Sequence, residues 1–158
     1  LVRIETCGFY ADSLERILPY VTEVALDVKT ELDADKYAKL AAFRGEPATL
    51  MQEILRSLII LRNAKQKTPN LAVEIRTTVI PKVNDSSEVI EKIAKEAEFA
   101  DKYVLQQFVA EGGLIDAAYA KFGTTPKQAL LELAEAALGH CGNVAICTQE
   151  DGEQAIEK

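Results

Sequence analysis

Charged and hydroxyl-bearing side chains recur where short apolar segments of this 158-residue chain end. Five of them could act together, and they are Glu5, Thr6, Asp27, Lys29 and Arg76. Two carboxylates, an ammonium and a guanidinium can bind a ligand that carries both signs of charge through charge-assisted hydrogen bonds. Polar groups at the ends of otherwise buried segments are costly unless they are paired. The pattern therefore indicates a ligand-binding site.

The apolar segments are short and β-branched or aromatic, and they alternate with longer helical patterns, which predicts a parallel α/β sheet. Strands are expected at about 2–7, 22–29, 71–80, 102–109 and 143–148. Helices are expected at about 11–19, 33–43, 47–66, 86–99, 125–140 and 151–157. In such sheets the carboxyl ends of the strands meet at one rim, where chemistry gathers. The polar residues should meet there.

The segment 47–66 is the clearest helix, because its apolar residues form one wide stripe: Leu50, Met51, Ile54, Leu55, Leu58 and Leu61. Pro47 suits the first turn, where its missing backbone donor costs nothing. Residues 84–88 offer N-caps for the next helix. Thr125 and Pro126 predict a capping box with proline at the first helical position.

Composition limits the function. The formal net charge of −7 argues against a nucleic-acid surface, which would show clustered Lys and Arg. No apolar run reaches the roughly 20 residues that span a bilayer, and no secretion signal is evident, so a cytoplasmic protein is expected. Residues 1–158 suffice for one domain, or a piece of one, but not for a complete (β/α)₈ barrel of about 250 residues.

The three cysteines, Cys7, Cys141 and Cys147, fit neither a disulfide framework nor a tetrahedral zinc pattern. We interpret them as small apolar residues rather than metal ligands. His140 is the only histidine and falls near the end of a predicted helix, where its charge would suit the helix dipole. We interpret it as structural.

Two of the polar motifs allow a plain structural interpretation. Asp27 and Lys29 share a face of their strand and could form either an ion pair or a ligand-binding pair. Arg76 needs a partner for its donors, and Glu74, on the same face, is the simplest candidate. Gly8 would let the backbone approach a ligand closely, or would only make a turn.

Taken together, four stretches resemble the radical S-adenosylmethionine (SAM) superfamily: Ile4–Phe9, Ala25–Lys29, Glu74–Pro81 and Leu105–Phe108. The branch most similar is the glycyl-radical-enzyme activases, namely the pyruvate formate-lyase activating enzymes and the anaerobic ribonucleotide reductase activating proteins. The resemblance covers residues 1 to about 110 and, more loosely, the last strand. It implies an α/β fold in which parallel β/α repeats form the C-terminal half of a TIM-like partial barrel.

The same resemblance implies roles for the polar residues. Asp27 and Lys29 would contact the amino-acid end or ribose of SAM, and Arg76 matches a SAM-contacting arginine. Glu5, Thr6, Asp27 and the carbonyl of Ala25 match positions where the family can place a monovalent cation. The chain departs from the family at three positions, with Glu5 in place of aspartate, Cys7 in place of asparagine and Val109 in place of a histidine.

Two family motifs do not occur in the sequence: the Cys-x₃-Cys-x₂-Cys that anchors a [4Fe–4S] cluster, and the Gly-Gly-Glu that holds the SAM amine. Gly112-Gly113 is followed by Leu114 and resembles no phosphate loop. The cluster ligands are expected in a missing N-terminal half. The resemblance implies that the full-length parent reductively cleaves SAM to a 5′-deoxyadenosyl radical and, with an external electron donor, activates a glycyl radical enzyme. This chain alone is expected to be inactive, with no catalytic or metal-binding residue of its own.

An open half-barrel would leave strand 2–7 with unpaired backbone groups, which are a template for pairing with another chain. We expect Ile4, Leu26 and Ile75 to face the barrel interior without cover. The chain is therefore expected to self-associate.

Two other functions remain open. One is a non-redox α/β barrel enzyme in which Lys29 forms a Schiff base while Asp27 or Glu74 transfers protons. The other is a non-catalytic binding module, supported only by the acidic composition and the incomplete site. The sequence does not identify a substrate.

Overall fold

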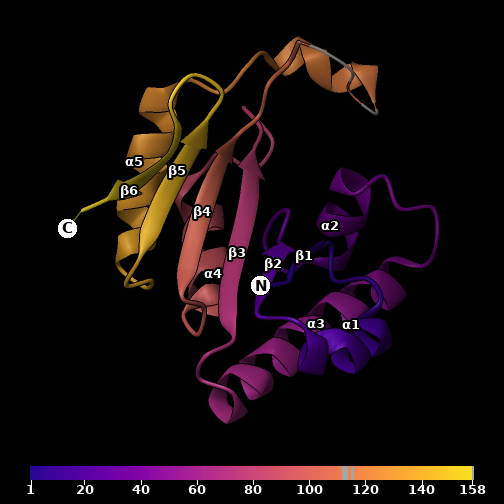
Figure 1. Cartoon of the computed structure of the whole chain (residues 1–158). Coiled ribbons are helices and arrows are strands. Elements are labelled where there is room, and N and C mark those ends of the chain that lie inside the picture. The colour runs from indigo at the N-terminus through magenta and orange to yellow at the C-terminus, as the bar shows by residue number, and fades with distance from the viewer. Residues whose placement is uncertain (112–113, 115, 158) are drawn as a thin grey trace.

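The computed structural model describes all residues except 112, 113, 115 and 158, so Gly112-Gly113 lies outside the described part. Six strands form one sheet in chain order: β1 (Arg3–Thr6), β2 (Glu23–Asp27), β3 (Ala72–Val79), β4 (Lys102–Gln107), β5 (Val144–Thr148) and β6 (Gly152–Ile156) (Figure 1). The first five strands pair in parallel, and β6 runs antiparallel to β5. The predicted parallel α/β class and its five strands are confirmed.

The helices are α1 (Ala11–Ile17), α2 (Ala34–Leu40), α3 (Pro47–Lys67), α4 (Ser87–Ala97) and α5 (Lys127–Leu138), with 3₁₀ turns η1 (Leu18–Tyr20) and η2 (Ala117–Phe122). α3 packs against β3 and also contacts α1 and α2. α5 packs against β4 and β5 and also contacts α4. None of the described helices is long and apolar enough to cross a membrane.

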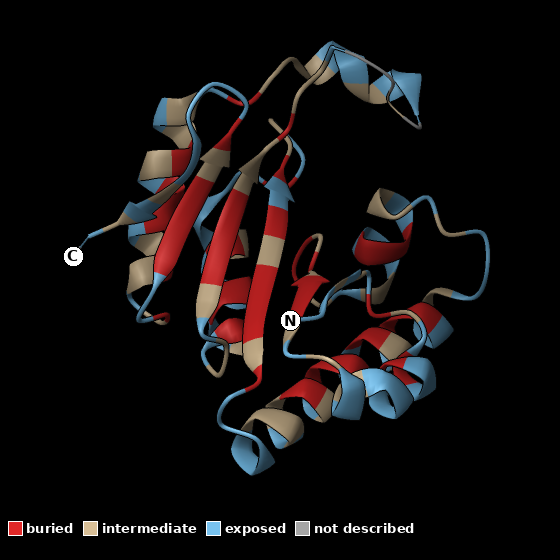
Figure 2. Ribbon diagram, viewed as in Figure 1, coloured by how far each residue is buried: buried red, intermediate tan, exposed pale blue. Residues whose placement is uncertain are grey.

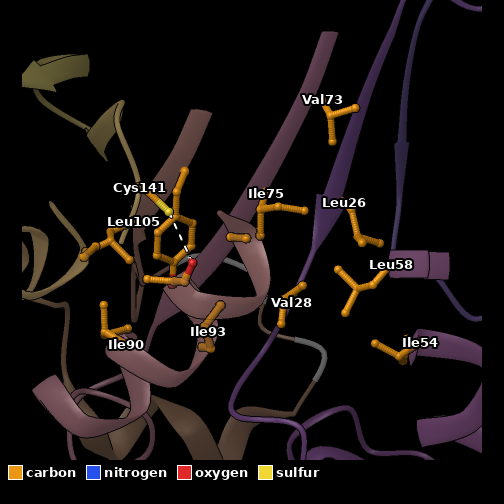
Figure 3. Close-up of a cluster of buried hydrophobic side chains, with 14 of the residues drawn as sticks. Leu26, Val28, Ile54, Leu58, Val73, Ile75, Ile90, Ile93, Leu105 and Cys141 are labelled. Carbon is orange, nitrogen blue, oxygen red and sulfur yellow. Dashed lines mark hydrogen bonds between the residues drawn. The ribbon is translucent and has the colours of Figure 1, made fainter. Parts of the chain in front are cut away.

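The buried core lies between the sheet and these helices (Figure 2). Leu26 and Ile75 from the sheet share it with Ile54 and Leu58 of α3 and Ile93 of α4 (Figure 3). The stripe predicted on 47–66 is buried apart from Leu55, which is 39% exposed.

The expectation that Ile4, Leu26 and Ile75 face a barrel interior is wrong. Leu26 and Ile75 belong to the core beneath the helices, and Ile4 packs against that core. Side chains alternate between the two faces of a strand, so the charged neighbours of these residues point to the other face, which we call the open face. These residues therefore do not form an exposed apolar face through which the chain could self-associate. Self-association through the edge of β1 stays a prediction.

The last predicted helix, 151–157, is also wrong, because Gly152–Ile156 is the strand β6. Gly152 has a φ of 69°, the left-handed conformation that closes a short hairpin loop after β5. The Asp151-Gly152 pair is a typical hairpin sequence. Exposed and partly buried residues also alternate along Gly152–Ile156, as in a strand, and Ile156 packs against the core.

The predicted helix starts are confirmed at two helices and wrong at one. Pro47 is in the first turn of α3, and the Ser86 side chain caps α4 by accepting a hydrogen bond from the backbone N–H of Val89. Thr125 forms no capping box. Its hydroxyl donates instead to the carbonyl of Val79 at 2.5 Å, and α5 begins two residues later. Thr125 therefore joins two segments that are distant in sequence.

A network of ion pairs centred on Glu74 lies on the open face of the sheet. Glu74 on β3 is only 4% exposed. Its carboxylate binds Arg3 Nη2 at 2.8 Å and Lys102 Nζ at 2.7 Å, and these two cations in turn bind Glu23 and Glu153. Burial by itself would raise the pKa of Glu74, but the hydrogen bonds and charges of Lys102 and Arg3 outweigh burial and hold that pKa below its usual range. The carboxylate is therefore ionised and structural.

We expect Glu74→Gln to lower the free energy of unfolding by about 1–3 kcal/mol near neutral pH, because two charge-assisted contacts are lost in a buried place. Urea denaturation measures the change. Glu153→Gln is the matched control: it removes a carboxylate from the same Lys102, but at an exposed position, and should cost about 0–1 kcal/mol.

The Glu74 effect should also depend on pH. Because the folded-state pKa lies below the ordinary 4.5, the stabilisation is complete above the unfolded-state pKa and is lost as the pH falls through the folded-state pKa. The difference between wild type and Glu74→Gln should therefore shrink in acid below that ordinary value. A difference that grew on acidification would contradict this assignment.

Candidate ligand-binding site

A guanidinium from the middle of β3 is held between two carboxylates at the carboxyl ends of β1 and β2. Arg76 Nη1 and Nη2 lie 2.8 and 3.1 Å from the two carboxylate oxygens of Glu5, and Arg76 Nε lies 2.9 Å from Asp27 Oδ1. Asp27 and Arg76 are direct partners in the parallel register of β2 and β3. We call these three residues the Arg76 cluster.

Both plain interpretations of these motifs are wrong. Asp27 pairs with Arg76 rather than with Lys29, and Arg76 pairs with Asp27 and Glu5 rather than with Glu74. Glu74 lies on the same face of β3, but its carboxylate is held by cations of β1 and β4. Two like-charged partners flank Arg76 because strands distant in sequence meet in this register.

The charges of the cluster reinforce one another. Burial by itself would lower the pKa of Arg76, whose side chain is 12% exposed, but the hydrogen bonds that Arg76 donates to Glu5 and the charge of Asp27 outweigh burial and raise that pKa above its usual range. The hydrogen bond from Arg76, together with its charge, lowers the pKa of Glu5. The cluster therefore holds two anions and one cation, and Glu5, 57% exposed, keeps one side open to solvent.

A cavity of about 410 Å³ adjoins the cluster. Asp27, Lys29 and Arg76 all line it, and the remaining wall comes from the segments that follow β3 and β4 and from the end of α2: Val28, Leu40, Ala41, Ala42, Thr78, Ile80, Phe108, Leu114, Asp116 and Tyr119. The volume and the mixture of apolar wall with a few charged groups are typical of a small-molecule site. We call it the β2–β4 cavity.

Two residues that sequence reasoning did not single out hold the segment after β2. The Tyr37 hydroxyl, buried on α2, accepts from Lys29 N at 3.2 Å and lies 3.3 Å from the Asp27 carbonyl, to which it donates. The Asn84 side chain donates to the carbonyls of Lys29 at 2.7 Å and Thr78 at 2.9 Å. No spacing in the sequence indicated either contact, since Asn84 was considered only as a helix cap.

Thr6 is not part of the Arg76 cluster. It follows Glu5 directly in β1, so its side chain points to the opposite face, and its hydroxyl accepts a hydrogen bond from Gly8 N at 3.0 Å. Gly8 approaches the core rather than the cavity. Its φ is 77°, and a Cβ there would lie 2.8 Å from Leu26 Cδ1, so glycine is required for packing.

The cysteines do not fit an iron–sulfur cluster. Cys7 is exposed, Cys147 is half-buried and Cys141 is buried, where its thiol lies 3.4 Å from the Ala94 carbonyl. Burial raises the pKa of Cys141 to about 11, whereas a metal ligand must be a thiolate. Within the described residues, no three His, Cys, Asp or Glu side chains are grouped as a metal site.

The sheet with its open face and rim cavity has the fold of a radical SAM domain. A radical SAM methyltransferase from Sphaerobacter thermophilus superposes on 92% of this chain and 40% of its own, with a TM-score of 0.71 and 15% identity. A domain of the pyruvate-formate lyase-activating enzyme from Bacteroides vulgatus covers 91% of this chain and 79% of its own, with a TM-score of 0.60 and 14% identity.

Sequence similarity relates the chain to activating enzymes within the radical SAM proteins. A protein of Methanocaldococcus jannaschii, described by its name as a glycyl-radical enzyme activating enzyme, is 32% identical over 149 residues, which are 93% of this chain and 58% of that protein. The isethionate sulfite-lyase activating enzyme of Oleidesulfovibrio alaskensis is 38% identical over 104 residues, which are 65% of this chain and 30% of that enzyme. No family model matches the chain.

These comparisons confirm the predicted resemblance to radical SAM proteins of the activating-enzyme kind. The chain spans 58% of the length of the M. jannaschii protein and 30% of that of the O. alaskensis enzyme.

We expect Asn84→Ala to destabilise the protein by about 1–3 kcal/mol, because the Lys29 and Thr78 carbonyls and the Ile80 N–H would lose their partner in a buried place. Asn63→Ala, an exposed position on α3, is the control and should change the stability by less than about 0.5 kcal/mol. Chemical denaturation measures both variants. Equal effects would show that Asn84 does not hold the rim together.

Proposed function

We propose that residues 1–158 form one domain of a radical SAM activating enzyme and that the β2–β4 cavity binds SAM. The observation that carries the proposal is the Arg76 cluster, which joins the carboxyl ends of β1 and β2 to the middle of β3 beside a cavity of about 410 Å³. Ligands of barrel-like parallel sheets bind at this rim. The relationship to activating enzymes supports the choice of ligand.

The residues present fit SAM chemically. SAM carries an ammonium, a sulfonium and a carboxylate, a net charge of +1, together with ribose hydroxyls. The cluster and Lys29 together carry two carboxylates, a guanidinium and an ammonium, so each charged group of SAM has an opposite charge available to it. Asp27 would accept hydrogen bonds from the ammonium or the ribose, while Arg76 and Lys29 would attract the carboxylate.

Arg76 already occupies the space between Glu5 and Asp27. Its charge does for these two carboxylates what a bound monovalent cation would do. Thr6, on the opposite face, would contribute only through its backbone or by holding the turn to Gly8. We therefore propose that Asp27, Lys29 and Arg76 make the direct contacts and that Glu5 orients Arg76.

Bound SAM, together with a [4Fe–4S] cluster, would supply the 5′-deoxyadenosyl radical; the residues described here would bind and orient it. We propose that the cluster thiolates come from another part of a longer protein, because the three cysteines of this chain do not fit the role. An external electron donor would then be needed. The partner would be a glycyl radical enzyme, such as an anaerobic ribonucleotide reductase or pyruvate formate-lyase; the names of the relatives support the class but not the individual partner.

The alternative Schiff-base enzyme loses one of its candidate groups. Glu74 is buried and bound to Arg3 and Lys102, so its carboxylate is engaged away from Lys29. Lys29 does line the cavity, and borohydride trapping of a carbonyl compound on Lys29 would favour that function over SAM binding.

In the full-length enzyme, we expect Asp27→Asn to weaken SAM binding by about 1–1.5 kcal/mol, the difference between a charge-assisted contact and a neutral one. Equilibrium titration with SAM measures the change. Asp151→Asn, in the hairpin before β6, removes the same charge at a distant exposed position and should bind SAM as the wild type does. An Asp27→Asn enzyme with unchanged affinity would overturn the proposed site.

We expect residues 1–158 alone to hold no stoichiometric iron–sulfur cluster after anaerobic reconstitution, because the three thiols lie in three different environments. Iron and sulfide analysis with electron paramagnetic resonance tests this. A [4Fe–4S] species that cleaves SAM on this chain would refute the proposal that the ligands lie elsewhere.

A further inference from the structure

A second cavity, of about 570 Å³, lies outside the Arg76 cluster. The segments after β2 and β3, together with α2, α4 and η2, enclose it: Thr30, Glu31, Lys36, Lys39, Leu40, Lys82, Val83, Val89, Ala118, Tyr119, Lys121 and Phe122. We call it the lysine cavity. We infer that it binds a small organic phosphate, a ligand that nothing in the proposed SAM site requires.

The charge of the lining is the first argument. Four ammonium groups and a single carboxylate line the cavity, although the chain as a whole has a net charge of −7. Glu31 is already bound to Lys36 Nζ at 2.6 Å and accepts from the Thr30 hydroxyl. Lys39, Lys82 and Lys121 take part in none of the ion pairs formed among the described residues. These three side chains are exposed, so they coexist without a bound anion, but together they give the cavity a positive potential that attracts one.

The chemistry of the remaining wall defines the rest of the ligand. Tyr119 and Phe122 contribute two rings whose centroids are 5.8 Å apart, with the Lys121 ammonium 5.0 Å from the centroid of the Phe122 ring. Leu40, Val83 and Val89 are apolar. Lysine binds phosphate as a point charge, while ring faces and aliphatic groups suit a flat organic body. The volume lies in the range for small ligands. These features together favour an organic phosphate over bare phosphate ion.

The backbone gives an independent indication. Among the described residues, the non-glycine positions with left-handed φ are Ala42 at 49° and Lys82 at 63°. Ala42 lines the β2–β4 cavity and Lys82 lines the lysine cavity. Non-glycine residues in this conformation are concentrated where ligands bind. Leu40 and Tyr119 line both cavities, so a ligand in the lysine cavity would lie against the wall of the proposed SAM site.

Calorimetric titration of the protein with 4-nitrophenyl phosphate, without SAM, tests the inference. We expect submillimolar binding that weakens as salt is raised, because exposed ammonium groups are screened. Inorganic phosphate and 4-nitrophenol should each bind more weakly than the aryl phosphate, since each offers only half of the recognised chemistry. The variant with Lys39→Gln and Lys121→Gln should bind about tenfold more weakly, roughly threefold for each exposed charge.

A variant with Lys67→Gln and Lys127→Gln loses the same two charges at positions that do not line the cavity, and it should bind like the wild type. Equal weakening in both double variants would show a nonspecific charge effect and overturn the assignment. Tighter binding of a tetraglutamate peptide than of the aryl phosphate would overturn the ligand class. This titration is done without SAM, so its result does not depend on whether Asp27→Asn weakens SAM binding. The two proposals are therefore tested separately.

Discussion

The two-residue alternation of the parallel strands is the constraint on which this structure depends. One face of every strand is buried under helices and is apolar, so each charged residue between core residues must point to the other face. That face cannot carry unpaired charge near the middle of a sheet. The result is two tiers of ion pairs, one centred on Glu74 and one on Arg76, at successive positions of β3 on the open face.

The two tiers differ in their accessibility. The carboxylate of Glu74 is buried and lies between cations of β1 and β4, Arg3 and Lys102. The Arg76 cluster lies two residues nearer the carboxyl end, and both of its carboxylates remain partly exposed. A buried, fully paired charge stiffens the sheet, whereas a paired but accessible charge can exchange a partner for a ligand. The Glu74 ion pairs therefore have a structural role, and the Arg76 cluster is the one that a ligand can reach.

Side-chain hydrogen bonds join segments that are distant in sequence at the rim. The Thr77 hydroxyl donates to the Val28 carbonyl at 2.7 Å and accepts from Tyr103 at 3.0 Å, while Asn84 joins the ends of β2 and β3. Thr77 and Asn84 thereby satisfy carbonyl groups near the strand ends. Sites whose charged groups are held in this way bind ligands with little reorganisation. The same rim separates the two cavities through Leu40 and Tyr119.

The sequence by itself determined the five parallel strands, the long helix now seen as Pro47–Lys67 and the resemblance to radical SAM activating enzymes. These depend on local periodicity and on short motifs, which are written along the chain. It also placed Asp27 and Lys29 in one cavity with Arg76, because strand ends in a parallel sheet must meet at one rim. Only the tertiary structure decided which partner each charge takes. Arg76 binds Glu5, 71 positions away, instead of Glu74 two positions away, because neighbours across the sheet lie closer than the sequence suggests. Thr125, Tyr37 and Asn84 serve distant backbone groups for the same reason, since a side-chain hydrogen bond is fixed by how strands and helices pack and not by spacing along the chain.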